Sequence, residues 1–148
     1  MVPRPSEASL TASFALTGGC HCGAVRYRVA APARELCHCH CSICRRLHGA
    51  VFATFAIVER DRFTIEHGAE RLTRYDSSSG AQRYFCSRCG GQIYSDVDSL
   101  PDVRFYTVGT LDGGAHPGHP SGGERHICVT SKIPWWPITD SLPQSPDT

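Results

Sequence analysis

The amino-acid sequence predicts a mainly β domain of small sheets, with one short helix and with clustered cysteines that organise the sheets. Short runs of alternating apolar residues are separated by Gly, Pro, Asp and Ser, which is typical of strands joined by turns. Nine cysteines and eight histidines occur in only 148 residues. No apolar run approaches the roughly 18 residues that a membrane-spanning helix needs.

Seven runs have the composition and period of strands. In the first, Val25, Tyr27 and Val29 fall on one face. Arg26 and Arg28 fall on the other, so this strand should have one buried and one exposed face. The predicted strands cover residues 24–29, 51–58, 62–66, 71–75, 92–95, 103–108 and 127–130.

One short helix is predicted over residues 42–48, where apolar residues recur four positions apart. The folded domain is predicted to span residues 17–143. A flexible N-terminal tail (1–16) precedes it and a short C-terminal tail (144–148) follows, because both ends are rich in Pro and Ser. Residues 112–124 form a long Gly/Pro loop, and loops of that length often carry function.

Charge and cysteine usage limit the possible function classes. The formal net charge is +1, which gives no electrostatic reason to expect nucleic acid or an anionic membrane as a partner. The N-terminal residues contain no apolar segment of the kind found in secretory signals, so a cytoplasmic location is expected. In a reducing compartment, clustered cysteines are metal ligands or redox groups more often than disulfides, and an odd number cannot pair completely.

The first cluster consists of Cys20 and Cys22 in a C-x-C pair and Cys86 and Cys89 in a C-x-x-C pair. Zinc–thiolate bonds of about 2.3 Å in a tetrahedron place the sulfurs about 3.8 Å apart. A C-x-x-C turn brings two sulfurs that close, and two residues on one face of a strand can supply two more. We therefore expect a closed structural zinc site that joins distant parts of the chain.

The second cluster consists of Cys39, Cys41 and Cys44, where a C-x-C pair runs into a C-x-x-C pair. Cys44 falls in the first turn of the predicted helix, whose N–H groups would favour a thiolate. Three protein ligands leave the fourth position of zinc open, as in catalytic zinc sites. We therefore expect a catalytic zinc here.

Other residues near the second cluster could also bind metal. Cys37 could close the site, but the backbone would have to bend sharply between Cys37 and Cys41. His38 and His40 should point away from the cysteine face, and His48 should end the helix or face solvent. These four residues remain less favoured alternatives.

With these motifs in place, the sequence resembles the glutathione-dependent formaldehyde-activating enzyme family, which includes centromere protein V. The matching stretches are residues 19–23 (GCHCG), 39–46 (CHCSICRR), 83–90 (RYFCSRCG), 109–112 (GTLD), 126–127 (HI) and 131–135 (SKIPW). The resemblance implies a β-tent of small coiled antiparallel sheets around two zinc ions, with the first cluster structural and the second catalytic. Cys37, Cys128 and the long loop before His126 depart from the family pattern.

The resemblance implies a carbon–sulfur lyase type of enzyme that joins the thiol of glutathione to formaldehyde. A substrate thiol would take the fourth zinc position, lose its proton there and attack formaldehyde. Glutathione carries two carboxylates, so Arg45 and Arg46, next to the second cluster, are its candidate contacts. Arg83 is expected beside the first cluster as a structural residue. Trp135 and Trp136 are expected in the core or, less favoured, in a pocket wall.

Two other classes of function stay open. The chain could be a non-catalytic zinc-binding interaction or scaffold domain. It could also act on another thiol or small electrophile, because a fold does not determine its substrate, with specificity in residues 112–124. A thioredoxin-like role lacks the βαβ context that it needs. A nucleic-acid function lacks a basic patch larger than Arg45 and Arg46.

Overall fold

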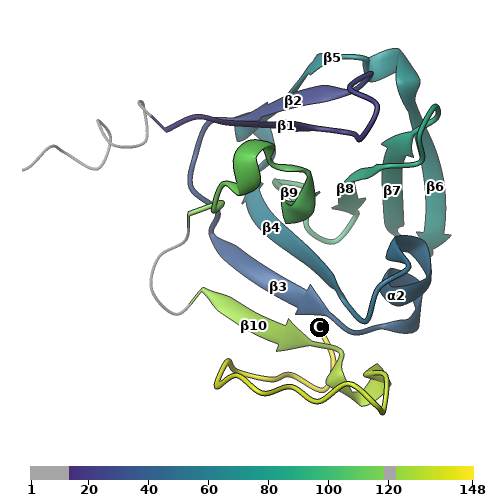
Figure 1. The fold of residues 1–148 in the computed structure, drawn as a ribbon, viewed down its shortest axis with the longest axis vertical. Helices are drawn as coiled ribbons and strands as arrows, with labels where there is room; N and C mark the ends of the chain where they lie inside the picture. Colours follow the sequence, from purple (N-terminus) through teal and green to yellow (C-terminus); the bar gives the residue numbers. More distant parts are fainter. Residues whose placement is uncertain (1–13, 119–122) are drawn as a thin grey trace, which may run out of the picture.

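The strands form two sheets in a computed structural model, which describes residues 14–118 and 123–148 (Figure 1). The smaller sheet has the strand order β1-β2-β5 and the larger one β10-β3-β4-β9-β8-β7-β6. The first sheet contains β1 (Leu16–Gly19), β2 (Arg26–Val29) and β5 (Phe63–His67). The second contains β3 (Glu35–Cys39), β4 (Ala53–Glu59), β6 (Leu72–Ser78), β7 (Ala81–Cys86), β8 (Gln92–Val97), β9 (Val103–Thr107) and β10 (Glu124–Ile127).

Helical structure in the described residues is short. The α-helix α2 (Ser42–His48) follows β3 and has the bounds that the sequence predicts. Cys41 caps its N-terminus, and Gly49 ends it in the left-handed conformation, with φ of 56°, which glycine adopts without strain. Single 3₁₀ turns are η1 (Arg60–Arg62), η2 (Ala69–Arg71), η3 (Val108–Thr110), η4 (Asp112–Gly114) and η5 (Val129–Ser131). No helix in the described ranges is long and apolar enough to cross a membrane.

The core lies between the two sheets. Val25, Tyr27 and Val29 are 0% exposed, which confirms the buried face predicted for the strand that contains them. Tyr27 stacks on Phe63 of β5, with ring centroids 4.8 Å apart. Tyr106 of β9 packs against both rings from the larger sheet. The mainly β class is therefore confirmed, and burial of large apolar side chains from both sheets holds them together.

One pair of strands departs from the expected antiparallel arrangement. β10 pairs with β3 in parallel, with Ile127 opposite Cys39. A parallel pair needs a long connection, and here the strands β4 to β9 lie between β3 and β10 in the sequence. The predicted strand over 127–130 is wrong in position: β10 ends at Ile127, because Cys128 adopts the left-handed conformation (φ of 56°) and η5 follows.

Both ends of the long loop over 112–124 are held by the sheets. Asp112 forms an ion pair with Arg26 of β2 and accepts a hydrogen bond of 2.7 Å from Thr17 of β1. Residues 119–122 of this loop, and residues 1–13 of the expected N-terminal tail, lie outside the described part of the chain.

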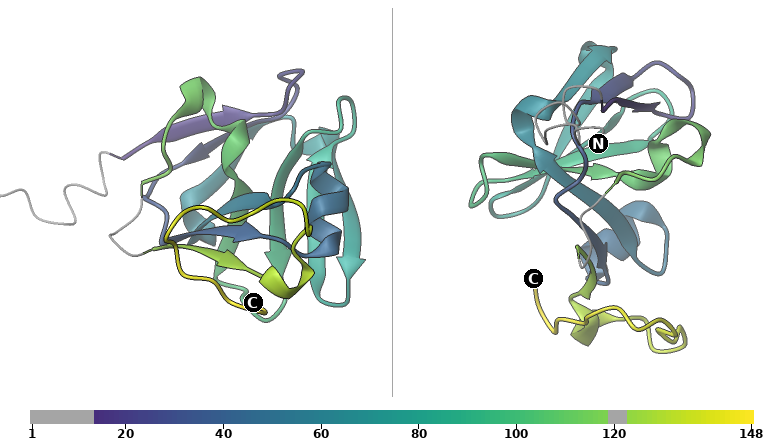
Figure 2. Two further views of the ribbon diagram at one scale, coloured as in Figure 1. Left: turned by 60° about the horizontal axis from the view of Figure 1, so that its bottom comes forward. Right: turned by 90° about the vertical axis from the view of Figure 1, so that its left-hand side faces the viewer.

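The expected C-terminal tail runs beside β10 (Figures 1 and 2). The N–H of His126 donates to the carbonyl of Pro143 at 2.9 Å, and the N–H of Ser145 donates to the carbonyl of His126 at 2.9 Å. The N–H of Cys128 donates to the carbonyl of Asp147 at 3.0 Å. This segment therefore covers an edge of the larger sheet that would otherwise be unpaired.

Candidate metal centres

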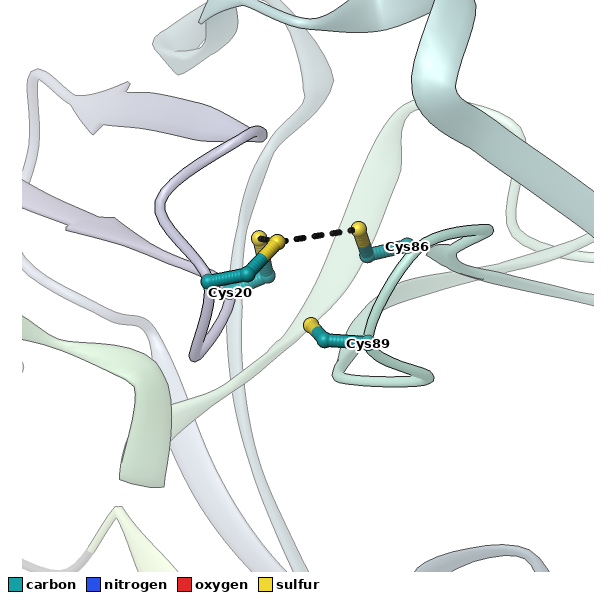
Figure 3. Close-up of side chains that lie close together, drawn as sticks. Cys20, Cys86 and Cys89 are labelled. Atoms are coloured by element: carbon teal, nitrogen blue, oxygen red, sulfur yellow. Dashed lines mark hydrogen bonds between the residues drawn. The ribbon is translucent and has the colours of Figure 1, made fainter.

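The first cluster lies where two turns from different sheets meet. Cys20 and Cys22 follow β1, whereas Cys86 ends β7 and Cys89 lies in the turn between β7 and β8. Their four sulfurs all lie within 4.8 Å of one another. Figure 3 shows Cys20 facing the Cys86–Cys89 turn, with the sulfurs directed into the same space. The Cys22 sulfur lies 3.6 Å from that of Cys20 and 3.8 Å from that of Cys86, close to the edge of a zinc–thiolate tetrahedron.

Glycines allow these turns to close. Gly23 and Gly90 both have φ of 78°, a conformation that costs glycine little. The N–H of Gly23 donates to the carbonyl of Cys20 at 3.1 Å, and that of Gly90 donates to the carbonyl of Cys86 at 2.8 Å. A Cβ on Gly91 would lie only 3.2 Å from the Cβ of Cys20. A side chain at this position would therefore require the two turns to move apart slightly.

Backbone N–H groups surround the sulfurs of the first cluster. Val25 donates to Cys20 at 3.2 Å and Arg88 donates to Cys86 at 3.4 Å. Hydrogen bonds from the backbone of Cys22 and then of Gly91 lower the pKa of Cys89 to about 6. Donors of this kind favour thiolates, the form in which cysteine binds a metal. Four sulfur donors at tetrahedral spacing fit zinc.

The second cluster lies at the junction of β3 and α2. Cys39 ends β3, Cys41 caps the helix and Cys44 lies in its first turn. The three sulfurs lie within 4.8 Å of one another. The N–H of Cys44 donates to the Cys41 sulfur at 3.3 Å. Hydrogen bonds from the thiols of Cys39 and Cys44 lower the pKa of Cys41 and leave its thiolate the most stable of the three.

None of the four alternative ligands joins the second cluster within the described residues. Cys37 is on the same face of β3 and is 2% exposed, but its sulfur lies outside the group. Burial, followed by the charge of Glu35, raises the pKa of Cys37 to about 12, so its thiol stays protonated. His48 packs edge-on against Phe55, with ring centroids 5.4 Å apart.

The other two alternatives, His38 and His40, lie on the opposite face of β3 from the cysteines. His38 contacts Thr54 and Glu124, each at 2.8 Å. His40 is fully buried, and its Nε2 lies 2.8 Å from Nδ1 of His126 on β10. Burial, followed by the charge of His126, lowers the pKa of His40 to about 4. These side chains position the strand that carries the second cluster.

A hydrogen-bonded chain of side chains, which no sequence pattern predicts, continues from His40 towards the surface. Nε2 of His126 lies 3.0 Å from Oδ2 of Asp140, whose carboxylate accepts the hydrogen bond. His126 belongs to the HI motif, but nothing in the sequence indicates that Asp140 is its partner. This series of hydrogen bonds links the loop between β3 and α2 to β10 and to the C-terminal segment.

Arg83 of β7 lies beside the second cluster, not the first. Its Nη2 donates to the Cys44 sulfur at 3.6 Å, and its Nε and Nη1 donate to the hydroxyls of Ser77 and Ser95 at 3.0 and 3.1 Å. Its guanidinium also covers the ring of Phe55. Arg83 and Cys86 are three positions apart on one strand and so face opposite sides of the sheet. The prediction that Arg83 lies beside the first cluster is therefore wrong.

A cavity of about 480 Å³ lies beside the second cluster, against one face of the larger sheet. Cys39 and Cys44 are among the residues that line it. The floor of the cavity consists of residues that lie opposite one another on neighbouring strands. One row of paired residues contains Glu35, Ile57, Phe105, Ser95 and Arg83, and a neighbouring row contains Arg125, Cys37 and Phe55. The strands thus place an apolar surface next to the cysteines.

Arg45 and Arg46 do not line this cavity. They line a separate depression of about 390 Å³ together with Val51 and Trp135. Trp135 is 67% exposed and Trp136 is 42% exposed, so the expected burial of these tryptophans in the core is wrong. Their segment follows η5 and lies outside the two sheets.

The two sheets and their cysteine clusters define a mainly β protein with two candidate thiolate metal centres. The sequence pattern of the glutathione-dependent formaldehyde-activating enzymes matches residues 15–129, so the chain belongs to this family. A Halomonas elongata protein named for the same family is 31% identical over an alignment of 127 positions, which covers 81% of this chain and 78% of that protein. A crystal structure of a Rhodobacter sphaeroides protein matches with a TM-score of 0.56 at 30% identity, covering 68% of this chain and 91% of the other.

Proposed function

We propose that the protein catalyses the zinc-dependent addition of a small thiol to formaldehyde, as a carbon–sulfur lyase type of enzyme. Membership of the glutathione-dependent family supports glutathione as the thiol. The observation that carries the proposal is the second cluster: its three sulfurs lie within 4.8 Å of one another, and two of its residues, Cys39 and Cys44, line a cavity. Three ligands next to open space are typical of catalytic zinc sites.

Zinc held by Cys39, Cys41 and Cys44 would supply a Lewis acid that favours the deprotonated form of a substrate thiol. The chain's own residues contribute positioning and charge. The hydrogen bond from Arg83 to Cys44 offsets the negative charge of the thiolates. The buried floor formed by Phe55 and Ile127 would keep water away from one side of the reacting groups.

The reaction balances without an oxidant or a reductant. The thiol sulfur forms a bond to the formaldehyde carbon, and the π bond of the carbonyl opens. The proton that leaves the thiol ends on the new hydroxyl. We propose a purely structural role for the first cluster, whose sulfurs bridge the two sheets.

Replacement of a ligand in the second cluster tests this function. In Cys41→Ser the fold should persist, because Cys41 lies at a helix cap and serine also caps helices. The zinc content should fall from two ions per chain to one, and the rate of adduct formation should fall by about 10²-fold or more. Elemental analysis and NMR detection of S-hydroxymethylglutathione measure these effects.

Cys37→Ser is the matched control, because Cys37 lies on the same face of β3 but outside the cluster. It should retain both metals and most of the activity. If Cys41→Ser keeps two zinc ions and full activity, the second cluster is not the catalytic site.

The exposed tryptophans favour a second candidate function, that of an interaction or scaffold domain. Trp135 lines a depression together with the arginines of α2, and Trp136 packs edge-on against Trp135. Exposed aromatic residues often mark contact surfaces. Adduct formation that is no faster with the zinc-loaded protein than in buffer would favour this function over catalysis.

A further inference from the structure

The cavity beside the second cluster is larger and less polar than formaldehyde needs. Formaldehyde has only two heavy atoms, whereas a volume of about 480 Å³ lies within the range of pockets that hold drug-sized ligands. Its apolar lining consists of Phe55, Ile57, Val97, Leu100, Phe105 and Ile127. Phe55 is 3% exposed and Ile127 is 9% exposed, so part of this lining is a deep floor.

The charged groups of the cavity are already engaged. Arg83 contacts Cys44 and two serine hydroxyls. Arg125 forms an ion pair with Glu35 at the far side of the floor. Apart from these paired groups, most of the lining of the cavity is apolar.

The position of the cavity connects it to the chemistry. Cys39 and Cys44 form its wall together with the apolar residues. A molecule whose reacting end lies at these sulfurs can extend its remaining atoms over Phe55 and Ile57. Burial of each methylene against such a surface is favourable, because it is removed from water.

We propose that this cavity binds an apolar group of roughly five to eight carbons, carried by the thiol or by the aldehyde that reacts at the second cluster. The inference rests on the proposed function and names its substrate class. Addition proceeds as with formaldehyde: a sulfur–carbon bond forms, the carbonyl π bond opens and the thiol proton ends on the hydroxyl.

Binding of a homologous series tests the cavity separately from catalysis. Straight-chain alcohols from ethanol to hexanol carry the apolar group without a reacting sulfur, and the matching thiols add it. Isothermal titration of the zinc-loaded full-length protein should show affinity rising about fourfold per methylene in both series. An affinity that does not change with chain length in either series would overturn the proposal.

Two substitutions locate the binding. Ile57→Trp fills the cavity from β4 and should weaken hexanol binding by about tenfold or more. Val51→Trp places the same side chain in the separate depression beside α2 and should change nothing. An equal loss in both variants would place the binding elsewhere and overturn the proposal. If Ile57→Trp does not fold, Phe105→Ala provides a second test. This variant enlarges the cavity, so the longest alcohol for which an added methylene still raises the affinity should become longer. An unchanged longest alcohol would overturn the proposal.

Turnover assays identify which reactant carries the apolar group. Hexanethiol with formaldehyde tests the thiol, and glutathione with hexanal tests the aldehyde. Faster turnover than with glutathione and formaldehyde in one assay assigns the group to that reactant. Alcohols that bind as expected while no thiol adds to any aldehyde would refute the proposed function but leave the cavity assignment standing.

Discussion

Arg83 connects the second cluster to the sheet beneath it. Its guanidinium holds the Cys44 sulfur, two hydroxyls and the face of Phe55 at once. Such a fixed cation beside thiolates favours their charged form, and arginine supplies several donors in one plane. The sequence could not reveal this role, because Arg83 and Cys44 are far apart in the chain and only the order of strands brings them together.

Loss of the Arg83 charge should make the second cluster bind metal less well in acid. In Arg83→Met, the pH at which this cluster releases half of its metal should rise by roughly one unit, because protons then compete better for the thiolates. Arg83→Lys should shift it less. A chelator competition followed across pH measures the midpoint. Arg74→Met, which removes an exposed arginine paired with Asp76, is the control. Equal midpoints in Arg83→Met and wild type would contradict this role.

At the scale of elements, helix α2 and the strands differ in how far the sequence predicts them. The bounds of α2 follow from local signals: apolar residues four positions apart and Gly49 at the end. Strand β10 was misplaced, because the left-handed turn at Cys128 has no local signal: the residue there is not glycine. Trp135 looks like a core residue by composition alone, and only tertiary structure shows that its segment lies outside the sheets.

The end of α2 contains a histidine that should make stability depend on pH. Burial, followed by the charge of Arg83, lowers the pKa of His48 to about 4, whereas an unfolded histidine titrates near 6.5. Below about pH 6.5 the unfolded chain therefore binds a proton that the folded chain does not. The contribution of the uncharged His48 to the free energy of unfolding is complete above about pH 6.5 and is lost as the pH falls towards 4.

His48→Phe should remove this dependence while keeping an aromatic ring against Phe55. Between pH 7 and 4, the wild type should lose about 2 kcal/mol more of its free energy of unfolding than the variant. Urea denaturation at several pH values measures the difference. His67→Phe, on β5, is the control variant. Parallel losses in wild type and His48→Phe would show that His48 does not contribute.

At the scale of the whole molecule, the first cluster joins the β1–β2 turn to the β7–β8 turn. The sequence predicts these four cysteines as metal ligands, because two cysteine pairs with metal-type spacing have few other uses in one chain. It does not predict the cavity, because the cavity depends on the register of six strands. Local sequence pattern therefore indicates which residues could bind metal but not what surrounds them.

Removal of one ligand from the first cluster should destabilise the whole fold. Cys22 is exposed, so Cys22→Ser leaves no buried void and reports on the metal alone. The melting temperature should fall by about 10 °C or more, because the link between the two sheets is weakened. Scanning calorimetry measures this, and Cys41→Ser should lower it by much less. Similar melting temperatures in wild type and Cys22→Ser would show that the first cluster is not structural.

The two clusters also differ in how much chain they enclose. Three cysteines between positions 39 and 44 are complete within a few residues, whereas the other four span positions 20 to 89. Closing a long loop costs more entropy than closing a short one. During synthesis on the ribosome, the local trio could bind an ion as soon as it emerges, whereas the long-range quartet would have to wait for the β7–β8 turn. The ligand spacing therefore predicts that the second cluster would be filled before the first.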